Sequence, residues 1–141
     1  MWDNDSNDIL GLDVTPEMKV ASDLLLKGAE AIAGYALPLK HMESTCALKC
    51  FASVRDHWNM SITDRARVMS CIEKCEEPME IVGEFIETER LKVIDSATSC
   101  LERCNEDDEI CANKCISDSI TSDRIDGMVS RIRSKIDSFR Y

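Results

Sequence analysis

The chain has 141 residues, of which 31% are charged and 44% are hydrophobic, a balance typical of a globular protein and not of a disordered one. Its formal net charge of −10 argues against nucleic acid or an anionic membrane surface as the main partner. The chain has only five glycines and three prolines, so long uninterrupted elements are expected.

Residues 1–14 are polar and acidic, and we expect them to form an N-terminal arm before a single helical unit over residues 15–141. This segment has neither the apolar stretch of a secretory signal nor the Arg-rich character of a mitochondrial presequence. The sequence Thr15-Pro16-Glu17 then predicts a helix start, because it offers a capping hydroxyl, a proline at the first helical position and an acid in the first turn. The first helix is predicted over about 16–57.

Two further long helices are predicted from the recurrence of apolar residues at steps of three, four and seven. The second, over about 63–104, opens at Thr63-Asp64 and contains Pro78, which either bends it or splits it. An acidic turn, 105–108, leads into the third, over about 108–139. No strand pattern competes, and no apolar run approaches the roughly 18 to 20 residues of a membrane span. The fold class is therefore predicted to be all-α, with three long antiparallel helices.

Eight cysteines form four Cys-x-x-x-Cys pairs, and none is left over. This spacing places the two sulfurs of a pair on one helix face, one turn apart. In an antiparallel hairpin, the sulfurs nearest the turn meet each other, and so do the two farther away. We therefore expect two successive disulfide-stapled hairpins with the bridges Cys50–Cys71, Cys46–Cys75, Cys104–Cys111 and Cys100–Cys115.

Three other interpretations of the cysteines stay open. Four thiolates from two facing pairs could hold a tetrahedral zinc ion, although structural zinc sites more often use a two-residue gap. A catalytic dithiol usually has the form Cys-x-x-Cys with one activated thiol, and no pair here is distinguished in that way. A secreted disulfide protein is chemically reasonable but normally carries a signal peptide. With His41 and His57 far apart and no partnered nucleophile, we expect no catalytic, cofactor-binding or metal residues, no cofactor and no enzymatic activity.

The C-terminal segment is basic within an acidic chain. From Arg124 to Tyr141 there are five basic and two acidic residues. The simpler explanation is a solvated helix end whose cations suit the C-terminal end of the helix dipole. The alternative is a docking arm for an acidic partner or for the headgroups of cardiolipin, which would be a peripheral contact with a membrane.

The paired cysteines suit an oxidising compartment, but we expect no cleavable targeting sequence. Both features fit the mitochondrial intermembrane space, where small cysteine-paired proteins are trapped by oxidation. The segments 71–78 (CIEKCEEP) and 100–105 (CLERCN), with the flanking pairs Cys46/Cys50 and Cys111/Cys115, resemble the "family with sequence similarity 136" proteins over roughly residues 16–139. The small Tim chaperones, with one such hairpin per chain, are more distantly similar. The resemblance implies an oxidised helical protein of the mitochondrial intermembrane space. A position peripheral to the inner membrane is our further expectation.

Two functional hypotheses follow from these features. The first is a structural or accessory subunit of a mitochondrial inner-membrane assembly, such as a respiratory complex or ATP synthase, whose partners would be its other protein subunits. Rigid, disulfide-linked helices are suited to a structural role, which needs no active site. The second is a chaperone or assembly factor like the small Tim proteins, for which the apolar stripe of the last helix is the candidate surface.

Overall fold

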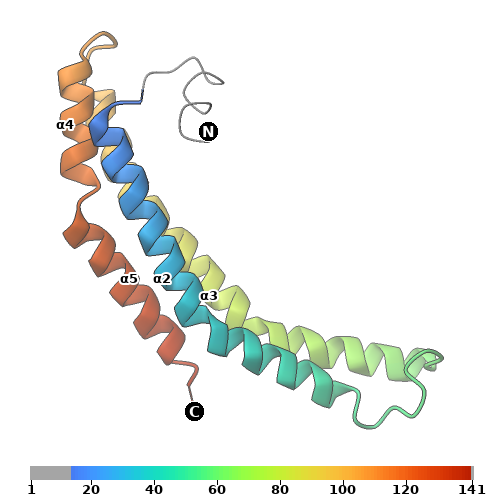
Figure 1. Ribbon diagram of the computed structural model, residues 1–141. Helices are drawn as coiled ribbons and strands as arrows, with labels where there is room; N and C mark the ends of the chain where they lie inside the picture. The colour runs from blue at the N-terminus through green and yellow to red at the C-terminus, as the bar shows by residue number, and fades with distance from the viewer. Residues whose placement is uncertain (1–13, 141) are drawn as a thin grey trace, which may run out of the picture. The chain divides into compact units, whose positions relative to one another are not determined.

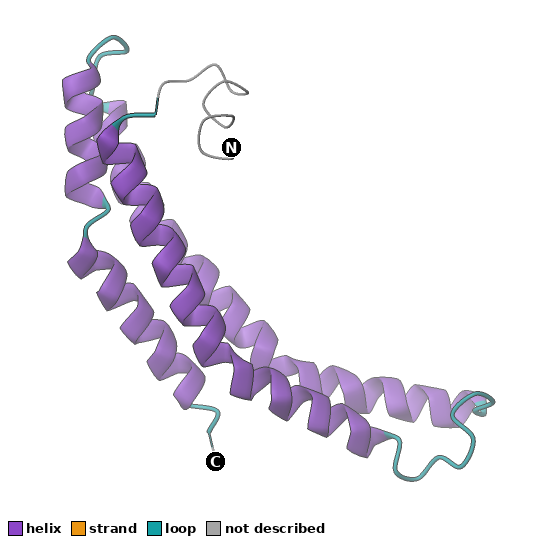
Figure 2. Ribbon diagram, viewed as in Figure 1, coloured by secondary structure: helices purple, strands orange, loops and turns teal. Residues whose placement is uncertain are grey.

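The computed structural model describes residues 14–140, which contain four α-helices and no β-strand (Figures 1 and 2). The helices are α2 (Pro16–Cys50), α3 (Ile62–Glu102), α4 (Glu109–Ser119) and α5 (Ser122–Asp137). The predicted all-helical class is thus confirmed. Of the N-terminal arm predicted over residues 1–14, only Val14 falls within the described residues. None of the described helices is both long enough and apolar enough to cross a membrane.

Helix α2 begins where the sequence predicts. The Thr15 hydroxyl oxygen accepts a hydrogen bond from the backbone N–H of Met18 at 3.2 Å, and Pro16 occupies the first helical position. The hydroxyl satisfies one of the backbone donors that a helix start leaves without a partner, and proline at this position loses no helical hydrogen bond.

The predicted end of the first helix, near His57, is wrong: α2 ends at Cys50. Phe51 and Ala52 donate their backbone N–H groups to carbonyls three residues back, which closes the helix with a tighter turn. The chain then turns so that Val54 becomes buried against Cys50 and Val68. We attribute the end of α2 to this burial, which stabilises the turn more than a further turn of helix would.

Helix α3 is one continuous helix through Pro78, so this proline does not split it. The Ser61 hydroxyl accepts the backbone N–H of Asp64 at 3.1 Å and caps the helix start, close to the predicted opening at Thr63-Asp64. The helix ends at Glu102, so that Cys104 lies in the turn that follows.

The third predicted helix, over about 108–139, is instead two helices with a break at Ile120 and Thr121. The backbone of Ile120 leaves the helical region, with φ −111° and ψ 83°. The Thr121 hydroxyl then accepts the N–H of Arg124 at 3.2 Å and so caps a new helix, α5. The chain therefore has four described helices in place of the three expected.

The chain divides into two compact units. Unit 1 comprises the chain up to Glu30 together with Arg90–Val129, and unit 2 comprises Ala31–Glu89 together with the chain from Ser130 onward. The buried side chains of each unit are mostly aliphatic, in keeping with the low aromatic content. Those of unit 1 include Ala21, Val93, Ala97, Cys115, Ile125 and Met128; those of unit 2 include Leu39, Cys50, Val54, Val68, Cys75, Val82, Ile132 and Ile136.

Two glycines inside α2 give a matched test of the packing of α5 on α2 within unit 1. A Cβ atom added at Gly28 would lie 2.9 Å from Cγ2 of Ile125, whereas one added at Gly34 would meet no atom within 4 Å. Alanine raises helix propensity by about 1 kcal/mol at either position. At Gly28 this gain is outweighed by overpacking against a stiff β-branched side chain, which typically costs about 1–3 kcal/mol.

We therefore expect Gly28→Ala to lower the free energy of unfolding by about 1 kcal/mol and Gly34→Ala to raise it by about 0.5–1 kcal/mol. Urea denaturation followed by circular dichroism measures both. Equal stabilisation by the two substitutions would show that α5 does not approach Gly28 closely.

Candidate functional site

The first feature is a pair of disulfides in unit 2, which we call the first clamp. Its bridges are Cys46–Cys75 and Cys50–Cys71, and both join α2 to α3 with Cα atoms 5.7 Å apart. The two bridges touch, because the sulfurs of Cys50 and Cys75 lie 3.7 Å apart. The clamp is also part of the core: Cys50 and Cys75 are buried in one cluster with Val54 and Val68, and Phe51, Met60 and Ile72 pack against it.

The second clamp, in unit 1, joins the end of α3 and the turn that follows it to α4. Its bridges are Cys100–Cys115 and Cys104–Cys111, with Cα separations of 5.5 and 5.8 Å. The Asp108 carboxylate accepts the backbone N–H of Cys111 at 3.0 Å, so the acidic turn sets the start of α4 and with it the position of this cysteine. All four predicted bridges are thus present in the structure.

Zinc binding and dithiol chemistry would both need the cysteines in their reduced form, and here they are oxidised to disulfides. Three sulfurs in each clamp lie within 4.8 Å of one another: Cys50, Cys71 and Cys75, and Cys104, Cys111 and Cys115. This is a spacing that a metal could bridge if the sulfurs were thiolates. Each one is bonded to another sulfur, and no free cysteine occurs within residues 14–140, so none is a thiolate ligand or nucleophile in this form.

The basic residues of α5 contact other residues of the chain. In unit 1, Arg124 donates a hydrogen bond to the Ser96 hydroxyl at 2.8 Å. Unit 2 contains three more such contacts: Arg131 with Glu89 at 2.9 Å, Arg133 over the Tyr35 ring at 4.5 Å, and Lys135 over the Phe85 ring at 5.8 Å. Four of the five cations of the basic C-terminal segment therefore help to hold α5 against α2 and α3.

Glu89 is the one buried carboxylate among the described residues, and sequence reasoning missed it. Its side chain is almost fully buried, while that of Arg131, with which it forms an ion pair, is more than half exposed. A buried charge is costly unless it is paired and hydrogen-bonded. Glu89 falls on the apolar face of α3, between Ile86 and Val93, and a charged residue there is a signal of a buried carboxylate. The sequence does not identify its partner, which is 42 residues away.

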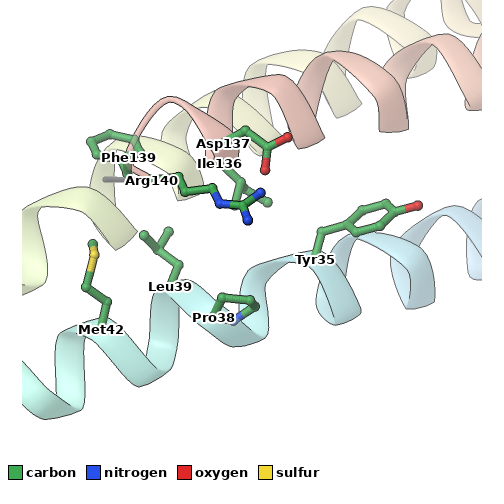
Figure 3. A pocket seen from close by; sticks show the side chains of 8 residues that line it. All are labelled: Tyr35, Pro38, Leu39, Met42, Ile136, Asp137, Phe139 and Arg140. Carbon is green, nitrogen blue, oxygen red and sulfur yellow. The ribbon is translucent and has the colours of Figure 1, made fainter.

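Sequence reasoning also missed an apolar groove in unit 2. It has a volume of about 550 Å³ and lies between the middle of α2 and the end of α5 (Figure 3). Its lining residues are Tyr35, Pro38, Leu39, Met42, Ile136, Asp137, Phe139 and Arg140. This volume is in the range of small-ligand sites, and the charged groups among its described lining residues are the exposed Asp137 and Arg140.

The histidines do not form a site with each other. His41 is exposed on α2, and the ring of His57 lies 5.2 Å from that of Phe51, next to the first clamp.

Comparison of the chain with protein-family models, with curated proteins and with solved structures finds no match.

Proposed function

We propose that the chain is a non-catalytic structural or accessory subunit of a mitochondrial inner-membrane assembly, such as a respiratory complex or ATP synthase, on the intermembrane-space side. The observation that carries this proposal is the doubling of the disulfides in each clamp. One disulfide fixes a distance between two helices, but two disulfides one turn apart also fix their relative rotation and direction. A clamp of two such disulfides favours a mechanical role.

The order of the bridges supports antiparallel helix hairpins as the mechanical element. In the first clamp the bridges pair Cys46 with Cys75 and Cys50 with Cys71, so the numbering rises along one helix as it falls along the other. The second clamp has the same nested order. Two successive hairpins of this kind would resist bending better than single helices held by a modest aliphatic core.

The proposed location follows from the chemistry of the sulfurs. Structural disulfides persist in oxidising compartments and are rare where thiols are kept reduced. The mitochondrial intermembrane space is such a compartment, and the resemblance of the Cys-x-x-x-Cys segments to "family with sequence similarity 136" proteins points to the same place. Contact of the C-terminal helix with cardiolipin stays a prediction, and of the four cations with intramolecular contacts only Arg131 is neutralised by a carboxylate, that of Glu89.

The apolar stripe of the last helix, expected to be the client surface of a chaperone, is instead buried at Ile125, Met128, Ile132 and Ile136. The apolar groove is the surface that favours this second candidate, a chaperone or assembly factor similar to the small Tim proteins. Its walls would accept one or two apolar side chains of a client segment, with Arg140 or Asp137 at the rim. A holdase of this kind binds many unfolded segments transiently, whereas a subunit binds one partner in a fixed ratio.

Native mass spectrometry of the protein isolated with its partners from mitochondria separates the two candidates. A subunit is expected in stoichiometric amount with one large membrane complex, and the variant Met42→Asp, which places a charge in the groove at a half-buried position, should leave this ratio unchanged. A chaperone is expected in a small soluble oligomer with varied substoichiometric clients, and the same variant should release them. Recovery of the chain as a free monomer would contradict both proposals.

A further inference from the structure

The loop between α2 and α3, residues 51–61, is held firmly at its base. Val54 is buried in the cluster around the first clamp, and Met60 packs against the same cluster. Between these two anchors, the carboxylate of Asp56 accepts the backbone N–H of Trp58 at 3.0 Å, and the Asp56 carbonyl accepts that of Asn59. The loop therefore presents Trp58 from a fixed platform.

The outer side of this loop carries large apolar side chains in water. Trp58 is 98% exposed and Ile62, the first residue of α3, is 85% exposed. Leu48 and Met69 on the adjoining helices are also well exposed, and Met69 follows Ile62 by seven residues, which places both on one face of α3. Leaving this much apolar surface in water is unfavourable, so a cluster of this kind marks an interaction site.

The same end of unit 2 is basic. Residues 48–69 contain four basic and two acidic residues, in a chain whose net charge is −10. Arg67 pairs with Asp64 at 2.9 Å. The other three cations, Lys49, Arg55 and Arg65, are exposed and form no ion pair with any residue in the range 14–140. We call the loop with Trp58, Ile62 and these three cations the Trp58 tip.

We propose that the Trp58 tip binds peripherally to the surface of an anionic phospholipid bilayer. Tryptophan favours the headgroup region, because its ring is apolar and its indole N–H remains hydrated there. Lysine and arginine beside it are attracted to the negative surface potential of anionic lipids. A protein interface is the weaker alternative, since its buried centre is normally depleted of charge, whereas here the exposed apolar residues are interspersed with cations.

The net charge of −10 does not prevent this contact. At physiological ionic strength charges are screened over about 8 Å, so the bilayer responds mainly to the groups at the tip. The start of α4 provides an internal comparison: Ile110 there is 83% exposed, but the preceding segment 106–109 consists of four acidic residues. An exposed apolar residue in that acidic setting should not bind an anionic surface.

Tryptophan fluorescence of the full chain with vesicles tests the proposal. In the variant Trp2→Phe, Trp58 is the single tryptophan. With phosphatidylcholine vesicles containing 30% phosphatidylglycerol, we expect its emission to shift to the blue and to be quenched by lipids brominated near the headgroup. Pure phosphatidylcholine vesicles should bind at least tenfold more weakly.

Matched variants identify the residues responsible, with binding measured by vesicle co-sedimentation. Trp58→Ser and the double variant Arg55→Gln/Arg65→Gln should each weaken binding to anionic vesicles by about tenfold, and higher salt should weaken the wild type more than the double variant, which keeps only Lys49 of the three unpaired cations. Ile110→Ser should leave binding within twofold of wild type. All these positions are exposed, so circular dichroism should show unchanged helix content.

Several results would overturn the proposal. Emission from Trp58 that is unaffected by anionic vesicles would do so, as would equal binding of Trp58→Ser and wild type. A blue shift that depends on protein concentration in the absence of lipid would show that the tip is covered by a second copy of the chain instead. None of these measurements depends on the proposed role in a mitochondrial complex.

Discussion

Replacing Cys46, Cys50, Cys71 and Cys75 by serine is expected to unfold the clamped ends of α2 and α3 and to lower the free energy of unfolding by roughly 5–6 kcal/mol. The Cys50–Cys71 bridge spans 21 residues of sequence, and its loss releases chain entropy worth about 3 kcal/mol in the unfolded state. With that bridge in place, Cys46–Cys75 closes only a small additional loop, which contributes about 2–3 kcal/mol. A small domain has a total stability of only about 5–15 kcal/mol, so the loss is decisive.

The nested geometry makes a second, more specific claim. Removing Cys46–Cys75 alone should cost only about 2–3 kcal/mol, because Cys50–Cys71 still closes the long loop and keeps Val54 and Val68 together. Urea unfolding measures the two costs, and hydrogen exchange locates them in residues 40–80. The corresponding serine variant of the second clamp is the control and should raise exchange around α4 instead. Unchanged exchange at the ends of α2 and α3 without the first clamp would contradict a stabilising role.

Local signals in the sequence were sufficient for features that depend on a few neighbouring residues. The cap at Thr15, the acidic turn before α4 and the four disulfide pairs all follow from groups within a few residues or from a fixed spacing along a helix. The all-helical class followed from the same periodicity. These features could be predicted because helix starts and cysteine pairs have their own chemistry, whatever surrounds them.

The features that were missed depend on contacts between distant segments. Helix α2 stops at Cys50 because Val54 is buried against Val68, a contact that no pattern around residue 50 records. The break before α5 at Thr121 has a capping hydroxyl, but threonine is also common inside helices, so the signal is ambiguous. The groove and the buried Glu89 require the end of α5 to lie against α2 and α3, which periodicity alone cannot specify.

The packing of α5 in unit 2 therefore provides the second large effect. Ile132 is completely buried, with 0% of its surface exposed, and it is one of the two largest fully buried side chains among the described residues. Ile132→Ala is expected to lower the free energy of unfolding by about 2–5 kcal/mol, because it removes buried apolar surface and leaves a cavity. Ile132→Val should cost only about 0.5–1.5 kcal/mol. Ser134→Ala, at an exposed position of the same helix, is the control and should have almost no effect.

Limited proteolysis distinguishes loosening of α5 from a general loss of stability. Trypsin cleaves after arginine and lysine in unfolded segments, and α5 offers it Arg131, Arg133 and Lys135, which the native fold holds against Glu89, Tyr35 and Phe85. If Ile132 anchors this helix, Ile132→Ala should be cut at these sites well before any site in α2 or α3. The disulfides still hold α2 and α3 together in that variant. Cleavage that begins elsewhere, or a stability equal to that of Ser134→Ala, would show that α5 is not fixed through Ile132.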